Sequence, residues 1–158
     1  MSTATTIDAK AFLTGWLGNV SGMYAADVTA IPEDKWNATF GGCTRPASEL
    51  TADALSLLVY CTRTMRGESA EGLMEELGPK CQTRESATAT IKQCCSDFSA
   101  AFDACPEEQL LNVIDTPFGM TMPLFSVCQI AVNHLWYHDG QLNYIQCLLG
   151  DDKVHWMG

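Results

Sequence analysis

The stretch Val132-Asn-His-Leu-Trp-Tyr-His-Asp-Gly-Gln-Leu-Asn-Tyr-Ile-Gln-Cys-Leu-Leu-Gly150 predicts a long helix, which is expected to run from about Pro123 to Gly150. Its periodicity is that of the buried face of an α-helix, with spacings of four and three through Val127, Ala131, His134, His138, Gln141, Ile145 and Leu148. His134 and His138 lie one turn apart on this stripe, so both imidazoles are expected to point the same way.

Three further segments carry the same periodicity, and turn residues separate them. They run from about Asp8 to Ile31, from Pro46 to Arg66, and from just after Thr83 to Pro106. A short helical turn is expected at Leu73–Leu77, ending where Gly78-Pro79 breaks the chain. The pattern predicts an all-α fold, a four-helix bundle. Residues 110–123 are rich in proline and glycine, which predicts a long extended crossover loop between the third and fourth helices that could hold a short strand pair.

Length, composition and charge limit the class of protein. The 158 residues fit a single domain, 1–158, and 47% hydrophobic with 18% charged residues is typical of a globular chain. The net charge of −10 would repel nucleic acid and anionic membranes, so neither is an expected partner. The N-terminal residues lack the basic start and apolar run of a signal peptide, and we expect a cytoplasmic protein.

The eight cysteines contain no C-x-x-C pair, which argues against a structural zinc site. Without an export signal they are expected to remain thiols, and most of them to be small core residues. Cys43 follows two glycines in a loop and is the thiol expected to be exposed and reactive. A thiol-based redox protein is an alternative that rests on the number of cysteines alone.

The histidine pair predicts a metal site, because burying two imidazoles requires two sets of partners unless one ion serves both. Asp53 is the candidate third ligand, since it lies three residues after Leu50 and four before Leu57 on the inward stripe of its helix or at the edge of that stripe. Two histidines and one carboxylate suit a divalent transition metal and leave positions open for water or substrate. In the alternative interpretation, Asp53 points to solvent or bonds a buried tyrosine or tryptophan.

Residues near the pair have candidate roles. Gly140 in a helix interior predicts a close approach of a neighbouring helix or room beside a metal. Gln141 is one turn beyond His138, where it could orient a ligand carboxylate or bound water, or cap a neighbouring loop. His155 is expected to be a tail residue. Four aromatic residues could line a pocket mouth or belong to the core: Trp36, Phe40, Trp136 and Tyr137.

The motif His134-x-x-x-His138-x-Gly140-Gln141-Leu142, preceded by Phe118-Gly119, resembles the closing signature of the DinB-like (DinB/YfiT-type) metalloenzymes. In these four-helix bundles, such a helix supplies two metal ligands. Pro46-x-x-Glu49-Leu50-x-x-Asp53 resembles the part of the second helix where the family usually has a third histidine. The resemblance covers nearly the whole chain in order and length. The chain departs from the family in having Asp53 at the third-ligand position and Asp139 where an arginine often precedes the Gly-Gln pair.

The resemblance implies an enzyme in which Asp53, His134 and His138 hold a divalent ion: zinc, nickel, iron or manganese. Relatives in the family imply a thiol S-transferase, or a related hydrolase or isomerase, with a small-molecule substrate, a low-molecular-weight thiol and a homodimeric state. The alternative is a non-catalytic dimeric bundle, or a small-molecule binding protein, in which the changed third ligand marks a degenerate metal site.

Overall fold

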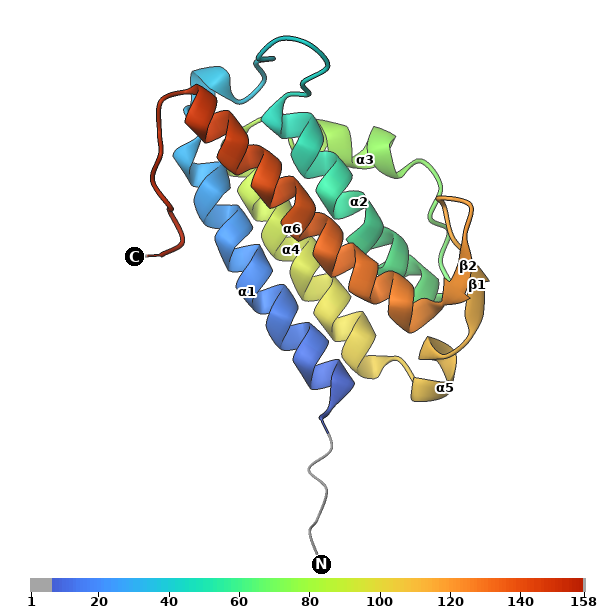
Figure 1. Ribbon diagram of the computed structural model, residues 1–158. Coiled ribbons are helices and arrows are strands. Elements are labelled where there is room, and N and C mark those ends of the chain that lie inside the picture. Colours follow the sequence, from blue (N-terminus) through green and yellow to red (C-terminus); the bar gives the residue numbers. More distant parts are fainter. Residues whose placement is uncertain (1–6, 158) are drawn as a thin grey trace, which may run out of the picture.

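The computed structural model describes residues 7–157, and four long helices form its frame (Figure 1). These are α1 (Ala9–Ala30), α2 (Ala47–Arg66), α4 (Arg84–Ala104) and α6 (Leu124–Leu148). Shorter elements join them: a 3-10 turn at Glu33–Lys35, α3 (Leu73–Lys80), α5 (Glu107–Leu110), β1 (Val113–Asp115) and β2 (Thr121–Pro123). The expected all-α four-helix bundle is confirmed.

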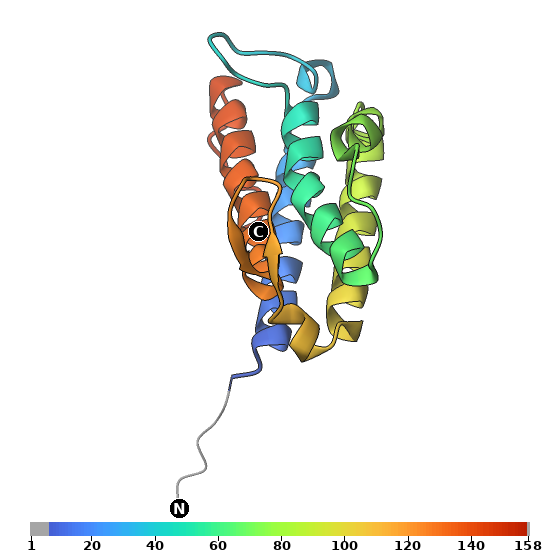
Figure 2. The ribbon, with the colours of Figure 1, turned by 90° about the vertical axis from the view of Figure 1, so that its right-hand side faces the viewer.

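Each helix of the bundle packs against two others. Both α1 and α2 contact α4 and α6, so α1 lies diagonally across the bundle from α2. Helices α1 and α6 run in one direction, and α2 and α4 run in the opposite direction (Figures 1 and 2). The chain therefore returns along the bundle through residues 67–83, with α3 packed on α2. The connection expected as a crossover loop between the last two long helices lies at one end of the bundle and holds α5 and the antiparallel β1–β2 pair.

The sequence signals explain most helix ends. Asp8 caps α1, because its carboxylate accepts from the backbone N–H groups of Lys10 and Ala11, each at 3.0 Å. Gly67, with φ of 71°, ends α2 in the left-handed conformation. The expected break at Gly78-Pro79 is wrong, since α3 continues to Lys80. Pro79 lies in the last turn of α3, where the missing N–H removes one hydrogen bond without stopping the helix.

The expected core faces of the first three long helices are buried almost throughout. The stripe predicted for α6 needs a correction: Leu148 is 47% exposed, while Leu135, Leu142 and Gln146 are buried. His138 lies on the buried face, whereas His134 and Gln141 lie at its border. Because α6 also carries apolar side chains on its outer face, periodicity alone did not define the centre of the stripe.

Of the four aromatic residues expected at a pocket mouth or in the core, Trp36 lies in the core and Phe40 is partly buried against it. Trp36 is fully buried and donates from Nε1 to the Cys81 carbonyl at 2.8 Å. Trp136 and Tyr137 are exposed on α6, and Trp136 packs edge-to-face on Trp16 with the ring centroids 5.3 Å apart. Trp36 therefore belongs to the core, and Trp136 and Tyr137 belong to the outer surface.

A buried polar cluster that the sequence did not predict joins α1 to α6. Asp27 and Asp139 are both buried, at 0% and 2% exposure. The Asn143 amide donates to Asp27 Oδ2 at 2.7 Å, and the Gln146 amide donates to Asp27 Oδ1 at 3.2 Å. Burial and then the neighbouring Asp27 raise the pKa of Asp139 from 3.8 to about 7. The bundle therefore holds one carboxyl that keeps its proton at pH values below about 7.

All eight cysteines are thiols, as expected, and six are buried. Cys43 is exposed, which agrees with its expected place in a loop, and Cys147 is exposed as well. Burial raises the pKa of Cys81 to about 12 and that of Cys94 to about 11, so these thiols are poor nucleophiles at neutral pH.

Of the helices within residues 7–157, none combines the length and the apolar character that a membrane span requires.

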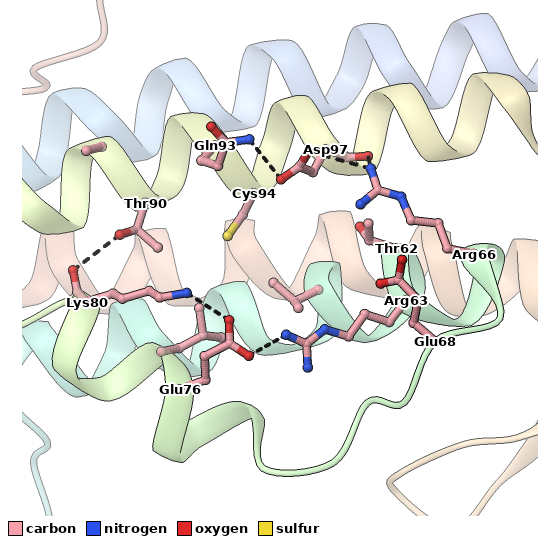
Figure 3. Close-up of a pocket in the computed structure, with 13 residues that line it drawn as sticks. Thr62, Arg63, Arg66, Glu68, Glu76, Lys80, Thr90, Gln93, Cys94 and Asp97 are labelled. Atoms are coloured by element: carbon pink, nitrogen blue, oxygen red, sulfur yellow. Dashed lines mark hydrogen bonds and ion pairs between the residues drawn. The ribbon is translucent and has the colours of Figure 1, made fainter.

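A cavity of about 510 Å³ lies between α2, α3 and α4, and charged side chains line it (Figure 3). Its cations are paired within the lining: Arg63 and Lys80 with Glu76, and Arg66 with Asp97. Cys94 lies among them with its raised pKa. These matched charges hold α3 and α4 against α2 and present no converging metal ligands.

Candidate metal centre

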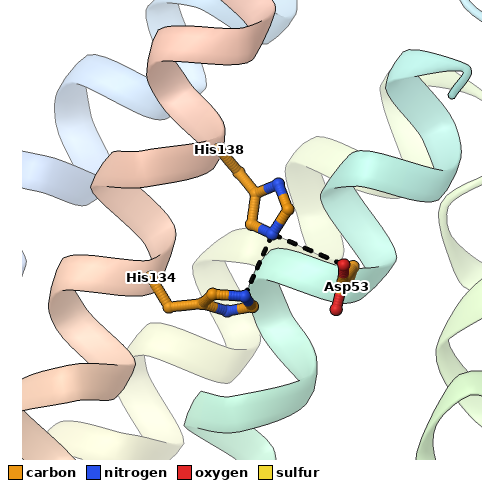
Figure 4. Close-up of side chains that lie close together, drawn as sticks. All are labelled: Asp53, His134 and His138. Atoms are coloured by element: carbon orange, nitrogen blue, oxygen red, sulfur yellow. Dashed lines mark hydrogen bonds and ion pairs between the residues drawn. The ribbon is translucent and has the colours of Figure 1, made fainter. Parts of the chain in front are cut away.

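Three side chains converge where α2 and α6 pack together. Asp53 comes from α2, and His134 and His138 come from successive turns of α6 (Figure 4). One ligand atom from each lies within 4.8 Å of the others. Over residues 7–157, no other group of three or more histidine, cysteine or acidic side chains could share an ion in this way. The structure thus brings together the three residues that the sequence predicted as metal ligands.

Two of the three distances between the ligand atoms are near those of a small divalent ion site. His134 Nε2 and His138 Nε2 are 3.1 Å apart, and His138 Nε2 is 3.5 Å from Asp53 Oδ2. In a tetrahedral zinc site with bonds of about 2.0–2.1 Å, neighbouring ligand atoms are about 3.3 Å apart. The two printed spacings are close to this value, whereas His134 and Asp53 lie farther apart, within 4.8 Å, so side-chain movement would be needed for all three atoms to bind one ion tetrahedrally.

Gln141 fixes the tautomer of His138. Its side-chain oxygen lies 2.6 Å from His138 Nδ1, so Nδ1 carries the proton and donates. In the neutral ring, Nε2 then bears a lone pair, and this lone pair faces His134 and Asp53. The sequence suggested that Gln141 orients a ligand carboxylate or bound water, or caps a neighbouring loop; in the structure its side-chain oxygen contacts the ring of His138.

Both imidazoles favour the neutral form, which is the form that binds a metal. Burial, followed by the proximity of His134, lowers the pKa of His138 to about 4. Burial also lowers the pKa of His134, against the attraction of Asp53. The lone pair of His138 Nε2 and the Asp53 carboxylate face each other at 3.5 Å, and a divalent ion between them would remove their repulsion.

His134 is held less directly than His138. Its Nδ1 is buried and forms no hydrogen bond with any described residue. The ring packs edge-to-face on His138, with the centroids 4.4 Å apart, and stacks on Tyr137. Packing therefore sets the orientation of His134, whereas a hydrogen bond sets that of His138.

Asp53 is partly buried, and its carboxylate pairs with Arg45. The Arg45 guanidinium donates to Asp53 Oδ2 at 2.7 Å, and the Asp53 side chain is 29% exposed. The alternative interpretation, in which Asp53 points to solvent or bonds a tyrosine or tryptophan, does not describe the structure. The sequence reasoning missed Arg45, which lies eight residues from its partner just before α2 begins.

A cavity of about 500 Å³ adjoins the three residues. Its walls come from residues 41–45 and from α2 and α6, and they include Cys43, Arg45, Leu50, Gln141, Tyr144 and Ile145. Two of these residues contact the candidate ligands: Arg45 contacts Asp53, and Gln141 contacts His138. A small molecule in the cavity would thus lie beside the candidate ligands.

His155 is not part of the candidate ligand group. It pairs with Asp151 at 2.8 Å, as expected of a tail residue.

Gly140 does not serve the close helix approach that the sequence suggested. A methyl group added there would meet no other atom within 4 Å, and the residue borders the cavity. Gly140→Ala is therefore expected to raise the free energy of unfolding by about 0.5–1 kcal/mol through helix propensity. Urea unfolding of the two proteins measures this difference, and a destabilised variant would show that the position needs glycine for packing.

No protein-family model and no curated protein matches the chain. Solved structures do match its fold. The mycothiol-dependent maleylpyruvate isomerase superimposes with a TM-score of 0.70 and 12% identity over 90% of this chain. A DinB-like protein, YjoA from Bacillus subtilis, superimposes with a TM-score of 0.66 and 18% identity over 88% of this chain and 92% of its own. The chain has the DinB-like fold.

This DinB-like bundle is shorter than one of its structural neighbours, since it spans 63% of the length of the isomerase. A mutant of that isomerase gives a similar superposition, with a TM-score of 0.71 and 14% identity. At these identities the likeness concerns the fold. Within the DinB-like bundle, the donor set of Asp53, His134 and His138 is one that could hold a metal ion.

Proposed function

We propose that this protein is a divalent-metal-dependent enzyme that acts on a small molecule together with a low-molecular-weight thiol, as a thiol S-transferase or a related hydrolase or isomerase. The observation that supports it best is the convergence of two imidazole nitrogens and a carboxylate oxygen at 3.1 and 3.5 Å, with the tautomer of His138 set by Gln141. Zinc, nickel, iron and manganese are the candidate ions.

Each residue has a defined part in this proposal. Asp53, His134 and His138 would hold the ion, and Gln141 would keep the His138 lone pair directed at it. A bound divalent ion supplies a Lewis acid that lowers the pKa of a thiol or of water at the remaining positions. The adjoining cavity of about 500 Å³ gives a small substrate room beside that ion.

The low-molecular-weight thiol is inferred from the structural neighbour that is a mycothiol-dependent isomerase. We further infer a homodimer, as the family resemblance implies, and the cytoplasmic location that the sequence led us to expect. Light scattering on the purified protein distinguishes a dimer from a monomer of 17.2 kDa.

Metal content is the first measurement. Protein purified without chelators and supplied with zinc, nickel, manganese or ferrous iron is expected to hold about one ion per chain by elemental analysis. Thiol conjugation is then measured with the loaded protein and with His138→Ala, which is expected to be inactive. Protein without stoichiometric metal would contradict the metal centre, and equal conjugation rates would remove the metal from the mechanism.

A non-catalytic bundle with a degenerate site is the second candidate function, and the pairing of Asp53 with Arg45 favours it, because that carboxylate already has a cationic partner. Two variants separate the candidates. If Asp53→Ala abolishes an existing metal affinity, Asp53 is a ligand. If the natural protein has no measurable affinity and Asp53→His creates one, the site is degenerate.

A further inference from the structure

Arg45 borders both the candidate metal centre and the adjoining cavity. Its guanidinium donates to Asp53 Oδ2 at 2.7 Å, and the same oxygen lies 3.5 Å from His138 Nε2. The side chain of Arg45 is 41% exposed and lines the cavity. One flexible cation thus lies within reach of the ligand carboxylate and of any molecule in the cavity.

The cavity is suited to an anion with an apolar body. None of its lining residues is acidic, although the chain has 19 acidic residues, and Arg45 is the charged residue among them. Leu50, Tyr144 and Ile145 give it apolar walls. A guanidinium at an apolar wall binds a carboxylate through paired hydrogen bonds while the walls cover the rest of the molecule.

A metal ion and Arg45 compete for the Asp53 carboxylate. An ion held by Asp53, His134 and His138 would place a double positive charge next to the guanidinium and repel it. An anion in the cavity would offer Arg45 another partner and release the carboxylate. Each binding event therefore removes an obstacle to the other, and thermodynamic linkage makes the effect reciprocal.

We propose that the cavity binds a small organic carboxylate through Arg45, and that this carboxylate and the metal ion strengthen each other's binding. The inference rests on the proposed function, because it takes Asp53, His134 and His138 as the metal ligands. It goes further by assigning the chemical class of the second molecule at the site and the residue that couples it to the metal.

Zinc affinity with and without benzoate tests the coupling. The zinc dissociation constant is measured by competition with a chromophoric chelator at constant ionic strength, with benzoate exchanged for chloride and corrected for zinc–benzoate complexes in solution. For the natural protein, benzoate is expected to tighten zinc binding about fivefold. For Arg45→Gln, zinc binding is expected to be about fivefold tighter without benzoate and to show no response to it.

Two further variants locate the effect. Arg66→Gln removes a cation that pairs with Asp97 and does not line the cavity beside the metal centre. It is therefore expected to keep both the zinc affinity and the benzoate response. Tyr144→Ala removes an apolar wall without touching the candidate ligands, so it is expected to keep the zinc affinity and lose most of the benzoate response.

The outcomes separate this inference from the proposed function. A benzoate response that persists in Arg45→Gln would place the anion on the metal itself and overturn the inference, as would tight zinc binding with no response in the natural protein. If zinc does not bind at all, the proposed function and the coupling both fail. The cavity is then still tested by fluorine NMR with 4-fluorobenzoate on metal-free protein, where equal binding to the natural protein and to Arg45→Gln would contradict the assigned contact.

Discussion

Replacing His138 by alanine is expected to lower the affinity for zinc or nickel at least about a hundredfold, because it removes the nitrogen that lies closest to both other candidate ligand atoms. Isothermal titration of metal-free protein measures the loss. Gln141→Leu is expected to lower the affinity about tenfold, since His138 keeps its ring but loses the partner that fixes its tautomer.

The chain offers a matched control for this prediction. His155 is also a histidine paired with an acidic residue, but it lies outside the cluster of candidate ligands. His155→Ala is expected to leave the affinity unchanged. Circular dichroism checks that each variant keeps its helices. Equal affinities for His138→Ala and the natural protein would show that metal binding, where present, occurs elsewhere.

Replacing Asp139 by asparagine is expected to stabilise the protein near pH 8 by about 2 kcal/mol, with little effect near pH 4. Asp139 is buried beside Asp27, and its pKa is raised to about 7 in the folded protein. The asparagine amide keeps the shape of the side chain and removes the need to bury or protonate a second carboxyl next to Asp27. Urea unfolding across this pH range, with a chelator present, measures the difference.

The sign of this effect follows from proton binding. Between the unfolded pKa of 3.8 and the folded pKa of about 7, the folded protein holds more protons on Asp139 than the unfolded chain does. Stability therefore falls as the pH rises through this window. The lowered pKa of His138 makes stability rise with pH between its folded pKa of about 4 and its usual value of 6.5. Because both proteins share this contribution, the variant is compared with the natural protein at each pH.

Asp152 provides the control, because its carboxyl is exposed near the C-terminus. Asp152→Asn removes the same charge without removing a buried group, and it is expected to keep the pH profile of the natural protein. A difference between Asp139→Asn and the natural protein that is the same at pH 4 and pH 8 would contradict the raised pKa of Asp139.

Much of the fold could be predicted from the sequence because helical periodicity is local. The stripes of the first three long helices identified their buried faces, and Asp8, Gly67 and Thr83 marked helix ends. Periodicity was less informative in α6, where exposed apolar residues such as Trp136 and Leu148 blur the stripe. Asp139 was consequently not recognised as a buried residue.

The sequence by itself determined the spacing of His134 and His138, because residues four apart on any helix share a face. Only the tertiary structure decided that Asp53 reaches them, since the packing of α2 on α6 sets which residue of one helix faces which residue of the other. The pairing of Arg45 with Asp53 and that of Asp27 with Asp139 arise in the same way. Local patterns specify which face of a helix is buried, whereas the neighbour on that face depends on how the whole chain packs.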